Sequence, residues 1–306
     1  MWRSTNAGAS WTPLTDQLPT LNARSICVDP GNADVLYYGT GHSVYLGGMG
    51  IYKSTDAGAN WTLFAQRVFG TGGILQDILG VNRLVVRRTS GGQVLVFAAT
   101  NRGLLRYTSA NPAAATTNPG DWTRLVPGAV MDVVVSPSNP EVAYASVQHT
   151  GIWRSTQAVT GGSNAWTNLP GTPVPITAKS ATWYTIDVFW GSPPSLYAAL
   201  ASPHEQSGTT FTRRGSLGIW WTTNNGSNWN QLLMTNISDL YNPFLRINPV
   251  TGLNVFFGGV KLYRMDIGQN PVKINGVHDD MQALEWNPHD IYGTSYYVCT
   301  DGGIWQ

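Results

Sequence analysis

The chain has 306 residues, of which only 11% are charged, and its formal net charge is +1. A near-neutral chain without a clustered excess of Lys and Arg lacks the positive surface that phosphate backbones require, so nucleic acid is excluded as the main partner. Glycine (34 residues), tryptophan (13) and tyrosine (13) are abundant. This bias favours strands and tight turns over long surface helices.

Two cysteines, Cys27 and Cys299, each lie in an apolar run, and we predict buried thiols. A disulfide between them requires that the two ends of the chain meet. No apolar run approaches the roughly 20 residues needed to span a bilayer. The first residues enter a repeat at once, so either export depends on a segment outside this sequence or the protein stays inside the cell.

Residues 2–14 read Trp-Arg-Ser-Thr-Asn-Ala-Gly-Ala-Ser-Trp-Thr-Pro-Leu, which predicts two short strands joined by a tight turn. The first complete unit follows, and we name its four predicted strands A, B, C and D in chain order. These strands cover residues 25–28, 35–38, 51–54 and 61–64.

The hairpin of strands C and D, residues 51–64, recurs along the chain, and Thr-Asp-Ala-Gly-Ala-Asn forms its turn. We expect Asp56 to accept hydrogen bonds from backbone N–H groups two and three residues further on. Gly58 should take the positive φ that other residues resist. Trp61 should fold over the hairpin and bury a large apolar surface.

Ser54-Thr-Asp-Ala-Gly-Ala-Asn-Trp61 resembles the Asp-box (BNR) repeat, Ser-x-Asp-x-Gly-x-x-Trp. That repeat occurs in sialidases, sortilin-type receptors, xyloglucan-cleaving glycoside hydrolases and secreted bacterial repeat proteins. The resemblance implies a β-propeller built of four-stranded blades. It also implies a structural role for the box, because those families carry it on the outer rim, away from any active site.

A mostly aromatic residue of strand C precedes each box, or the place where a box is expected, and it recurs at a spacing of roughly 40 to 70 residues. Such a spacing is typical of propeller blades. These residues are Trp2, Tyr52, Leu105, Trp153, Trp220, Tyr263 and Trp305. The first blade covers about 23–64, and further blades are predicted at about 75–125, 130–169, 184–232 and 244–274. The second box is interrupted by residues 111–119, the third has Gln157 and the fourth Asn224 in place of Asp, and the fifth blade has no box. Residues 202–217 are predicted to be a long polar loop between strands B and C.

The last blade, about 281–306, supplies strands A and B and only the start of a strand C. Residues 2–14 supply a strand C and a strand D. If they complete the last blade, six blades close into a single β-propeller domain over residues 1–306, without exposed sheet edges. If both ends lie within a longer propeller, the native protein has seven or eight blades.

In a propeller, strand A lines the central channel, and the D-to-A and B-to-C loops share the face around the channel mouth. The candidate ligand-binding residues on this face are His42, Trp183, Tyr184, His204, His278, Asp280 and Asp301. Trp183 and Tyr184 form a loop aromatic pair suited to stacking on a sugar ring or a peptide side chain. Long loops also collect polar residues without any function, and the aromatic pair could instead fill the gap between blades. No spacing matches a preformed metal site, so we predict neither a metal nor a cofactor.

Asp77, Asp132 and Asp187, near the start of strand A in three blades, point toward the channel mouth in this arrangement. A pair of carboxylates there could cleave glycosidic bonds, a reaction that uses one acid and one base or nucleophile. The alternative, which we favour, is that these carboxylates accept hydrogen bonds from the backbone of neighbouring blades.

Thr300-Asp-Gly-Gly-Ile-Trp305 resembles, with one residue fewer, the Thr-Asp-x-Gly-Gly-x-aromatic segment that carries a catalytic aspartate in xyloglucan-cleaving propellers. The same run occurs in secreted repeat proteins without known activity, where a segment like His278-Asp-Asp280 often precedes it. A sialidase is disfavoured, because Phe244-Leu-Arg-Ile-Asn-Pro249 is only loosely similar to the Phe/Tyr-Arg-Ile-Pro motif and lies late in the chain.

The resemblance to the sortilin-like and xyloglucanase-like group therefore implies a secreted or cell-surface propeller that binds a glycan or a protein through its channel-mouth face. The alternative is a glycoside hydrolase that uses Asp301 with Asp77, Asp132 or Asp187. The sequence predicts no membrane span and leaves the oligomeric state open.

Overall fold

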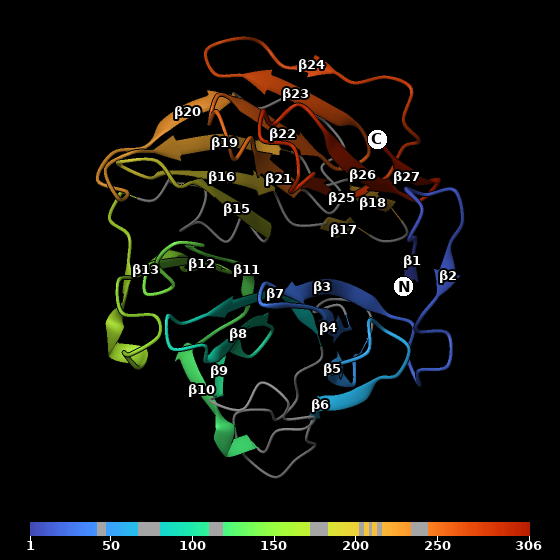
Figure 1. Cartoon of the computed structure of the whole chain (residues 1–306). Coiled ribbons are helices and arrows are strands. Elements are labelled where there is room, and N and C mark those ends of the chain that lie inside the picture. Colours follow the sequence, from blue (N-terminus) through green and yellow to red (C-terminus); the bar gives the residue numbers. More distant parts are fainter. Residues whose placement is uncertain are drawn as a thin grey trace. The chain divides into compact units, whose positions relative to one another are not determined.

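A computed structural model describes residues 1–41, 47–66, 80–109, 119–171, 183–201, 205–207, 210–212, 216–233 and 244–306. This described part contains 27 strands and two 3-10 helices, η1 (Pro119–Asp121) and η2 (Ser163–Ala165), so the fold is all-β (Figure 1). The chain divides into two compact units. The first comprises Met1–Ala145 with Arg154–Thr167, and the second comprises Ser146–Trp153 with Asn168–Gln306.

The strands form antiparallel sheets in which strands close in sequence pair, as in propeller blades. The first sheet has β3 (Ala23–Asp29), β4 (Asn32–Thr40), β5 (Gly50–Ser54) and β6 (Thr62–Gln66). The second has β7 (Val81–Arg88), β8 (Val94–Thr100), β9 (Gly103–Ser109) and β10 (Trp122–Val126). The third has β11 (Val130–Val135), β12 (Ala143–Val147), β13 (Gly151–Ser155) and β14 (Trp166–Asn168).

Three further sheets complete the series. The fourth has β15 (Trp183–Phe189), β16 (Ser195–Ala201), β19 (Ser216–Thr222) and β20 (Asn230–Leu233). The fifth has β21 (Phe244–Ile247), β22 (Asn254–Gly258), β23 (Leu262–Asp266) and β24 (Val272–Lys273). The sixth has three described strands, β25 (Met281–Trp286), β26 (Tyr296–Thr300) and β27 (Gly303–Trp305). The predicted class, an all-β propeller of six blades, is confirmed.

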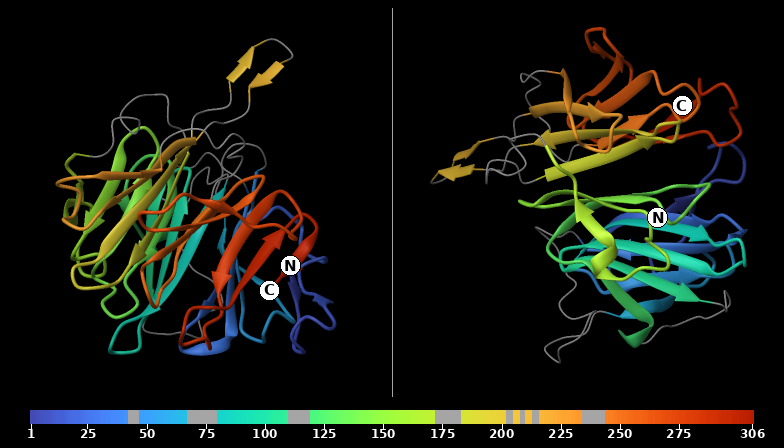
Figure 2. Two further views of the ribbon diagram at one scale, coloured as in Figure 1. Left: turned by 90° about the horizontal axis from the view of Figure 1, so that it is seen from above. Right: turned by 90° about the vertical axis from the view of Figure 1, so that its left-hand side faces the viewer.

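The connection between β16 and β19 of the fourth sheet contains a separate two-stranded sheet that the sequence did not predict. Within residues 202–217, predicted to be a loop, β17 (Glu205–Ser207) and β18 (Thr210–Thr212) pair as a hairpin. Figure 2 shows this hairpin standing away from the sheet that it interrupts. The fifth blade also has a short strand D, β24, where no box was found in the sequence.

The box turns fold as one repeated structure. Ser54 Oγ accepts the backbone N–H of Asp56 at 3.3 Å and of Gly58 at 2.8 Å, and Asp56 Oδ1 accepts the backbone N–H of Asn60 at 2.8 Å. The copies that begin at Ser4 and Thr222 make the same three bonds. The Asp56 carboxylate thus bonds to the N–H of Asn60, four residues ahead, and also interacts with the backbone N–H of Ala59, three residues ahead as predicted. The N–H two residues ahead, that of Gly58, is taken by the serine hydroxyl instead.

Gly58 has the predicted positive φ, +89°. Trp61 folds over the turn and donates from Nε1 to Gly58 O at 3.1 Å and to Leu14 O at 2.9 Å. Leu14 also packs against Gly58, where a β-carbon would lie 2.6 Å from Leu14 Cδ1. The box therefore forms a turn and also binds the segment at Leu14, which precedes the first blade in the sequence.

The first hairpin consists of β1 (Trp2–Arg3) and β2 (Thr12–Pro13). It packs on the first box, where Arg3 donates a hydrogen bond to Ala57 O. Leu169 holds the same place against Gly226 of the fourth blade. The hairpin thus packs on the first blade as a strand D packs on the blade after it. In the described residues, β1 and β2 pair with each other, and β25 to β27 pair among themselves. Closure of the sixth blade by this hairpin remains a prediction.

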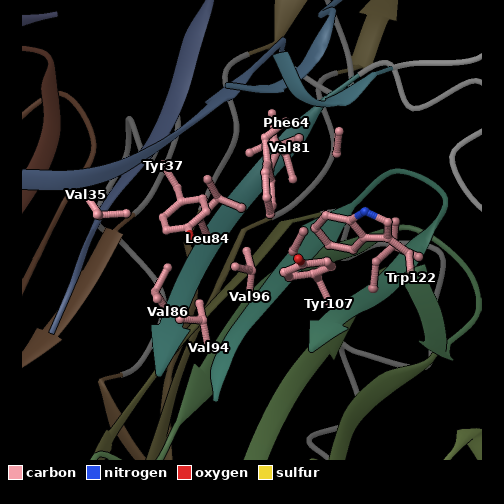
Figure 3. Close-up of a cluster of buried hydrophobic side chains, with 14 residues drawn as sticks. Val35, Tyr37, Phe64, Val81, Leu84, Val86, Val94, Val96, Tyr107 and Trp122 are labelled. Carbon is pink, nitrogen blue, oxygen red and sulfur yellow. The ribbon is translucent and has the colours of Figure 1, made fainter. Parts of the chain in front are cut away.

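Aromatic side chains fill the space between the first and second sheets (Figure 3). The Phe64 ring meets Tyr37, Tyr107 and Trp122 edge to face, at centroid distances of 5.3, 5.0 and 6.1 Å. All four side chains are buried, and such pairs add stability beyond the area that they bury. Both cysteines are free and partly buried, where the sequence predicted buried thiols.

Candidate functional site

Three loop segments of the second unit meet at one place. The segment that leads into β25 donates from the N–H of Asp280 to Val260 O at 2.8 Å, and Met281, the first residue of β25, donates to Gly259 O at 2.7 Å. Val260 and Gly259 belong to the turn between β22 and β23. In the turn between β26 and β27, the N–H of Asp301 donates to Asp280 O at 3.3 Å. A D-to-A segment therefore lies between two B-to-C turns, the arrangement expected from the strand order of a blade.

We call the polar residues at this place the polar cluster. Its members are Lys261, His278, Asp279, Asp280, Gln282 and Asp301. The cluster unites the two segments that the sequence singled out, His278-Asp-Asp280 and Thr300-Asp-Gly-Gly. The contact is not evident from the sequence, because β25 and most of β26 lie between the two segments.

The His278 ring lies directly over Gly302. A β-carbon at Gly302 would stand 2.4 Å from His278 Cγ, so any other residue there would displace the imidazole. His278 Nδ1 is 2.8 Å from Asp279 O. A carbonyl oxygen only accepts, so Nδ1 carries a proton, and in the neutral ring Nε2 is left as a hydrogen-bond acceptor.

The carboxylates of the polar cluster differ in their partners. Lys261 pairs with Asp279, and this hydrogen bond holds the pKa of the Asp279 carboxyl below its usual value. Asp301 Oδ1 accepts a hydrogen bond from Gln282 Nε2 at 2.7 Å. Among the described residues, neither Asp280 nor Asp301 forms an ion pair, and the Asp301 side chain is exposed. The cluster thus carries two carboxylates without a neutralising cation, together with an amide and an imidazole.

Asp132 and Asp187 take a different role, in strands β11 and β15. Asp187 Oδ2 accepts the backbone N–H of Ile247, in the strand A of the next blade, and its Oδ1 accepts the N–H of Val188, both at 2.9 Å. Asp132 Oδ1 accepts the N–H of Val133 at 2.9 Å and lies 3.9 Å from Arg83 Nε. For Asp187, the hydrogen bond from Ile247 is the inter-blade backbone contact that we favoured over catalysis.

Several predicted site residues stand apart from the polar cluster. His42, Asp77 and His204 lie outside the described residues. Trp183 and Tyr184 are the first two residues of β15, paired with Ala201 and Leu200, so their predicted place in a loop was wrong.

The sequence did not single out Lys261 or Gln282. Lys261 ends a Gly-Gly-Val-Lys turn and Gln282 follows the first residue of β25. Lys261 lies in a B-to-C turn and Gln282 at the start of a strand A, and these positions could have indicated the site. Neither residue belongs to a recognisable motif, so the sequence did not point to them.

No metal-binding group is found in the part of the chain that the structure describes, since no three His, Cys, Asp or Glu side chains are placed to hold an ion. None of the described helices is long and apolar enough to cross a membrane.

Comparisons with known proteins place the chain by its fold. No family model matches the sequence, and no curated protein matches it. Among solved structures, a GH74 xyloglucanase from Xanthomonas campestris is similar at a TM-score of 0.64 and 15% identity, over 99% of this chain and 48% of that one. A GH74 enzyme from Niastella koreensis gives a TM-score of 0.62 and 18% identity over the same shares. The chain therefore spans about half the length of these two enzymes, and the likeness establishes a β-propeller.

Proposed function

We propose that this chain is a secreted or cell-surface binding propeller that recognises a glycan through the face carrying the polar cluster. The observation that carries the proposal is that three inter-segment backbone hydrogen bonds bring the segments of His278, Asp280 and Asp301 together, with Gln282 bonded to the Asp301 carboxylate. Sugar hydroxyl groups donate and accept hydrogen bonds, and these side chains supply both kinds of partner. A fixed backbone reduces the entropy lost when the ligand binds.

The charge of the polar cluster narrows the class of glycan. This face carries Asp279, Asp280 and Asp301 against Lys261 and Lys273, so negative charges are in excess by one. Sialic acids, uronic acids and sulfated sugars would be repelled. Neutral or amino sugars fit this site, and the fold likeness to a xyloglucanase directs attention to neutral polysaccharides of plant and microbial origin.

A glycan screen tests the proposal. The full chain is applied to immobilised neutral and acidic polysaccharides, alongside Gln282→Ala, His278→Ala and His289→Ala. His289 lies in the turn between β25 and β26 and is the matched control. We expect binding to neutral polysaccharides that the first two variants weaken and the control keeps. Binding of a protein instead of any glycan, or equal losses in all three variants, would refute the proposal.

A second candidate function is hydrolysis of a polysaccharide. It is favoured by the exposed Asp301 in a Thr-Asp-Gly-Gly segment and by the fold likeness to two GH74 enzymes. The sequence predicts Asp301 as one carboxylate of such an enzyme, and Asp77, Asp132 or Asp187 as the other. The hydrogen bonds that Asp132 and Asp187 make to backbone N–H groups weigh against both as the partner.

Incubation with xyloglucan and other neutral polysaccharides separates the two functions. A hydrolase releases new reducing ends from the polysaccharide, and the Asp301→Asn substitution abolishes this release. A binding protein releases none, while Asp301→Asn still changes its affinity for the intact polymer.

A further inference from the structure

The chain contains two Asn-Gly pairs, Asn225-Gly226 and Asn275-Gly276. In such a pair the backbone nitrogen of the glycine can attack the side-chain carbon Cγ of the asparagine. Ammonia leaves and a succinimide ring closes, and water then opens the ring to aspartate or isoaspartate. Glycine favours this attack because no β-carbon shields its nitrogen and its backbone turns freely.

Asn225-Gly226 is locked by the fourth box. The N–H of Gly226 donates to Thr222 Oγ1 at 3.1 Å, so the attacking nitrogen is already engaged. Gly226 is buried, and a β-carbon there would lie 2.9 Å from Leu169 Cβ. Asn225 itself is held at φ +53°. Ring closure at this pair would require the box turn to open.

Asn275-Gly276 is unrestrained by comparison. Both residues are exposed, Gly276 has φ +89°, and no atom lies within 4 Å of the position of a β-carbon. Among the hydrogen bonds of the described residues, none involves the N–H of Gly276. The pair follows Ile274, whose N–H bonds to Leu262 O at 2.9 Å, and it begins the segment that carries His278.

We infer that Asn275 is a site of spontaneous deamidation, and that Asn225 is protected by its box. The reaction replaces a neutral amide by a carboxylate, and it needs no reactant other than water. The new charge appears two residues after Lys273 and three before His278, at the edge of the polar cluster. Lys273 already acts electrostatically on Asp279, so deamidation changes the charge balance of this face.

Peptide mapping of the full chain tests the inference without any ligand. The protein is aged at mildly alkaline pH, digested and analysed by mass spectrometry with a label specific for isoaspartate. We expect the peptide with Asn275 to gain acid and isoaspartate forms while the peptide with Asn225 stays unchanged. An Asn275→Asp variant marks the ion-exchange position of the acidic form.

Two variants make the test specific. Gly276→Ala should slow conversion at Asn275, because a β-carbon then shields the nitrogen. Thr222→Val should expose Asn225 to conversion, because it removes the acceptor of the Gly226 N–H. An unchanged Asn275, or equal conversion of both sites in the unmodified sequence, would overturn the inference.

Discussion

Replacing Ser54 by alanine tests whether burial determines how much a box turn contributes to the free energy of unfolding. Ser54 is 1% exposed, and its hydroxyl accepts the N–H of Gly58, which is also buried. The variant leaves that N–H without a partner and out of reach of water, at a cost of about 2 kcal/mol. For a cooperative chain of this size, such a loss lowers Tm by about 3 °C.

Ser4→Ala is the matched control, because Ser4 makes the same bonds to the N–H groups of Asn6 and Gly8. Gly8 is exposed, so water replaces the lost acceptor and the expected cost stays below about 1 kcal/mol. Both variants are measured by guanidinium unfolding and by calorimetry. Equal losses would show that burial does not set the stability of the box.

Three further predictions concern the turns and one ion pair. Gly58→Ala should destabilise the chain by about 1 to 3 kcal/mol more than Gly8→Ala, because both have a positive φ but only Gly58 is tightly packed against a leucine; urea unfolding measures both. Hydrogen bonds, first that from the Asn60 N–H, lower the pKa of Asp56 below its ordinary 3.8, so its stabilisation is present above that pH and is lost as pH falls through the lowered pKa. Asp56→Asn should keep the turn, as the asparagines of two other boxes do, and should lack this acid-sensitive component in pH-dependent melting. Arg88→Ala should cost about 3 kcal/mol by urea unfolding, because it strands the fully buried carboxylate of Asp29; a loss no larger than that of an exposed pair would contradict this.

The fold was predictable because its instructions are local. A serine or threonine, an aspartate or asparagine, and a glycine within five positions define the box turns that begin at Ser4, Ser54 and Thr222, and their hydrogen bonds show that the same three positions act in these copies. The spacing of these turns indicated that the chain is built of repeated blades. Strands without such a signal were missed, such as β17 and β18 in a polar segment and the short strand β24.

The candidate site was predictable only in part. The sequence indicated His278, Asp280 and Asp301, because each stands in a recognisable segment. The ion pair of Lys261 with Asp279 is a contact across 18 residues of sequence, and it depends on how the turn after β22 meets the segment before β25. An inter-blade hydrogen bond of Asp187 was favoured from its place near the start of a strand A, but its donor, the N–H of Ile247, is set by packing between blades, which no local pattern encodes.

The central claim is that Asp301 serves a ligand while Asp187 serves the fold. It is tested most directly by measuring, for Asp301→Ala and Asp187→Ala, both the melting temperature and the affinity for a neutral oligosaccharide selected by the glycan screen. We predict that Asp301→Ala keeps the melting temperature and weakens binding about tenfold or more, the value of a hydrogen bond to a charged group. Asp187→Ala should lower the melting temperature, because the N–H of Ile247 loses its acceptor. The opposite pattern, with Asp301→Ala unstable and Asp187→Ala stable but unable to bind, would contradict the assignment.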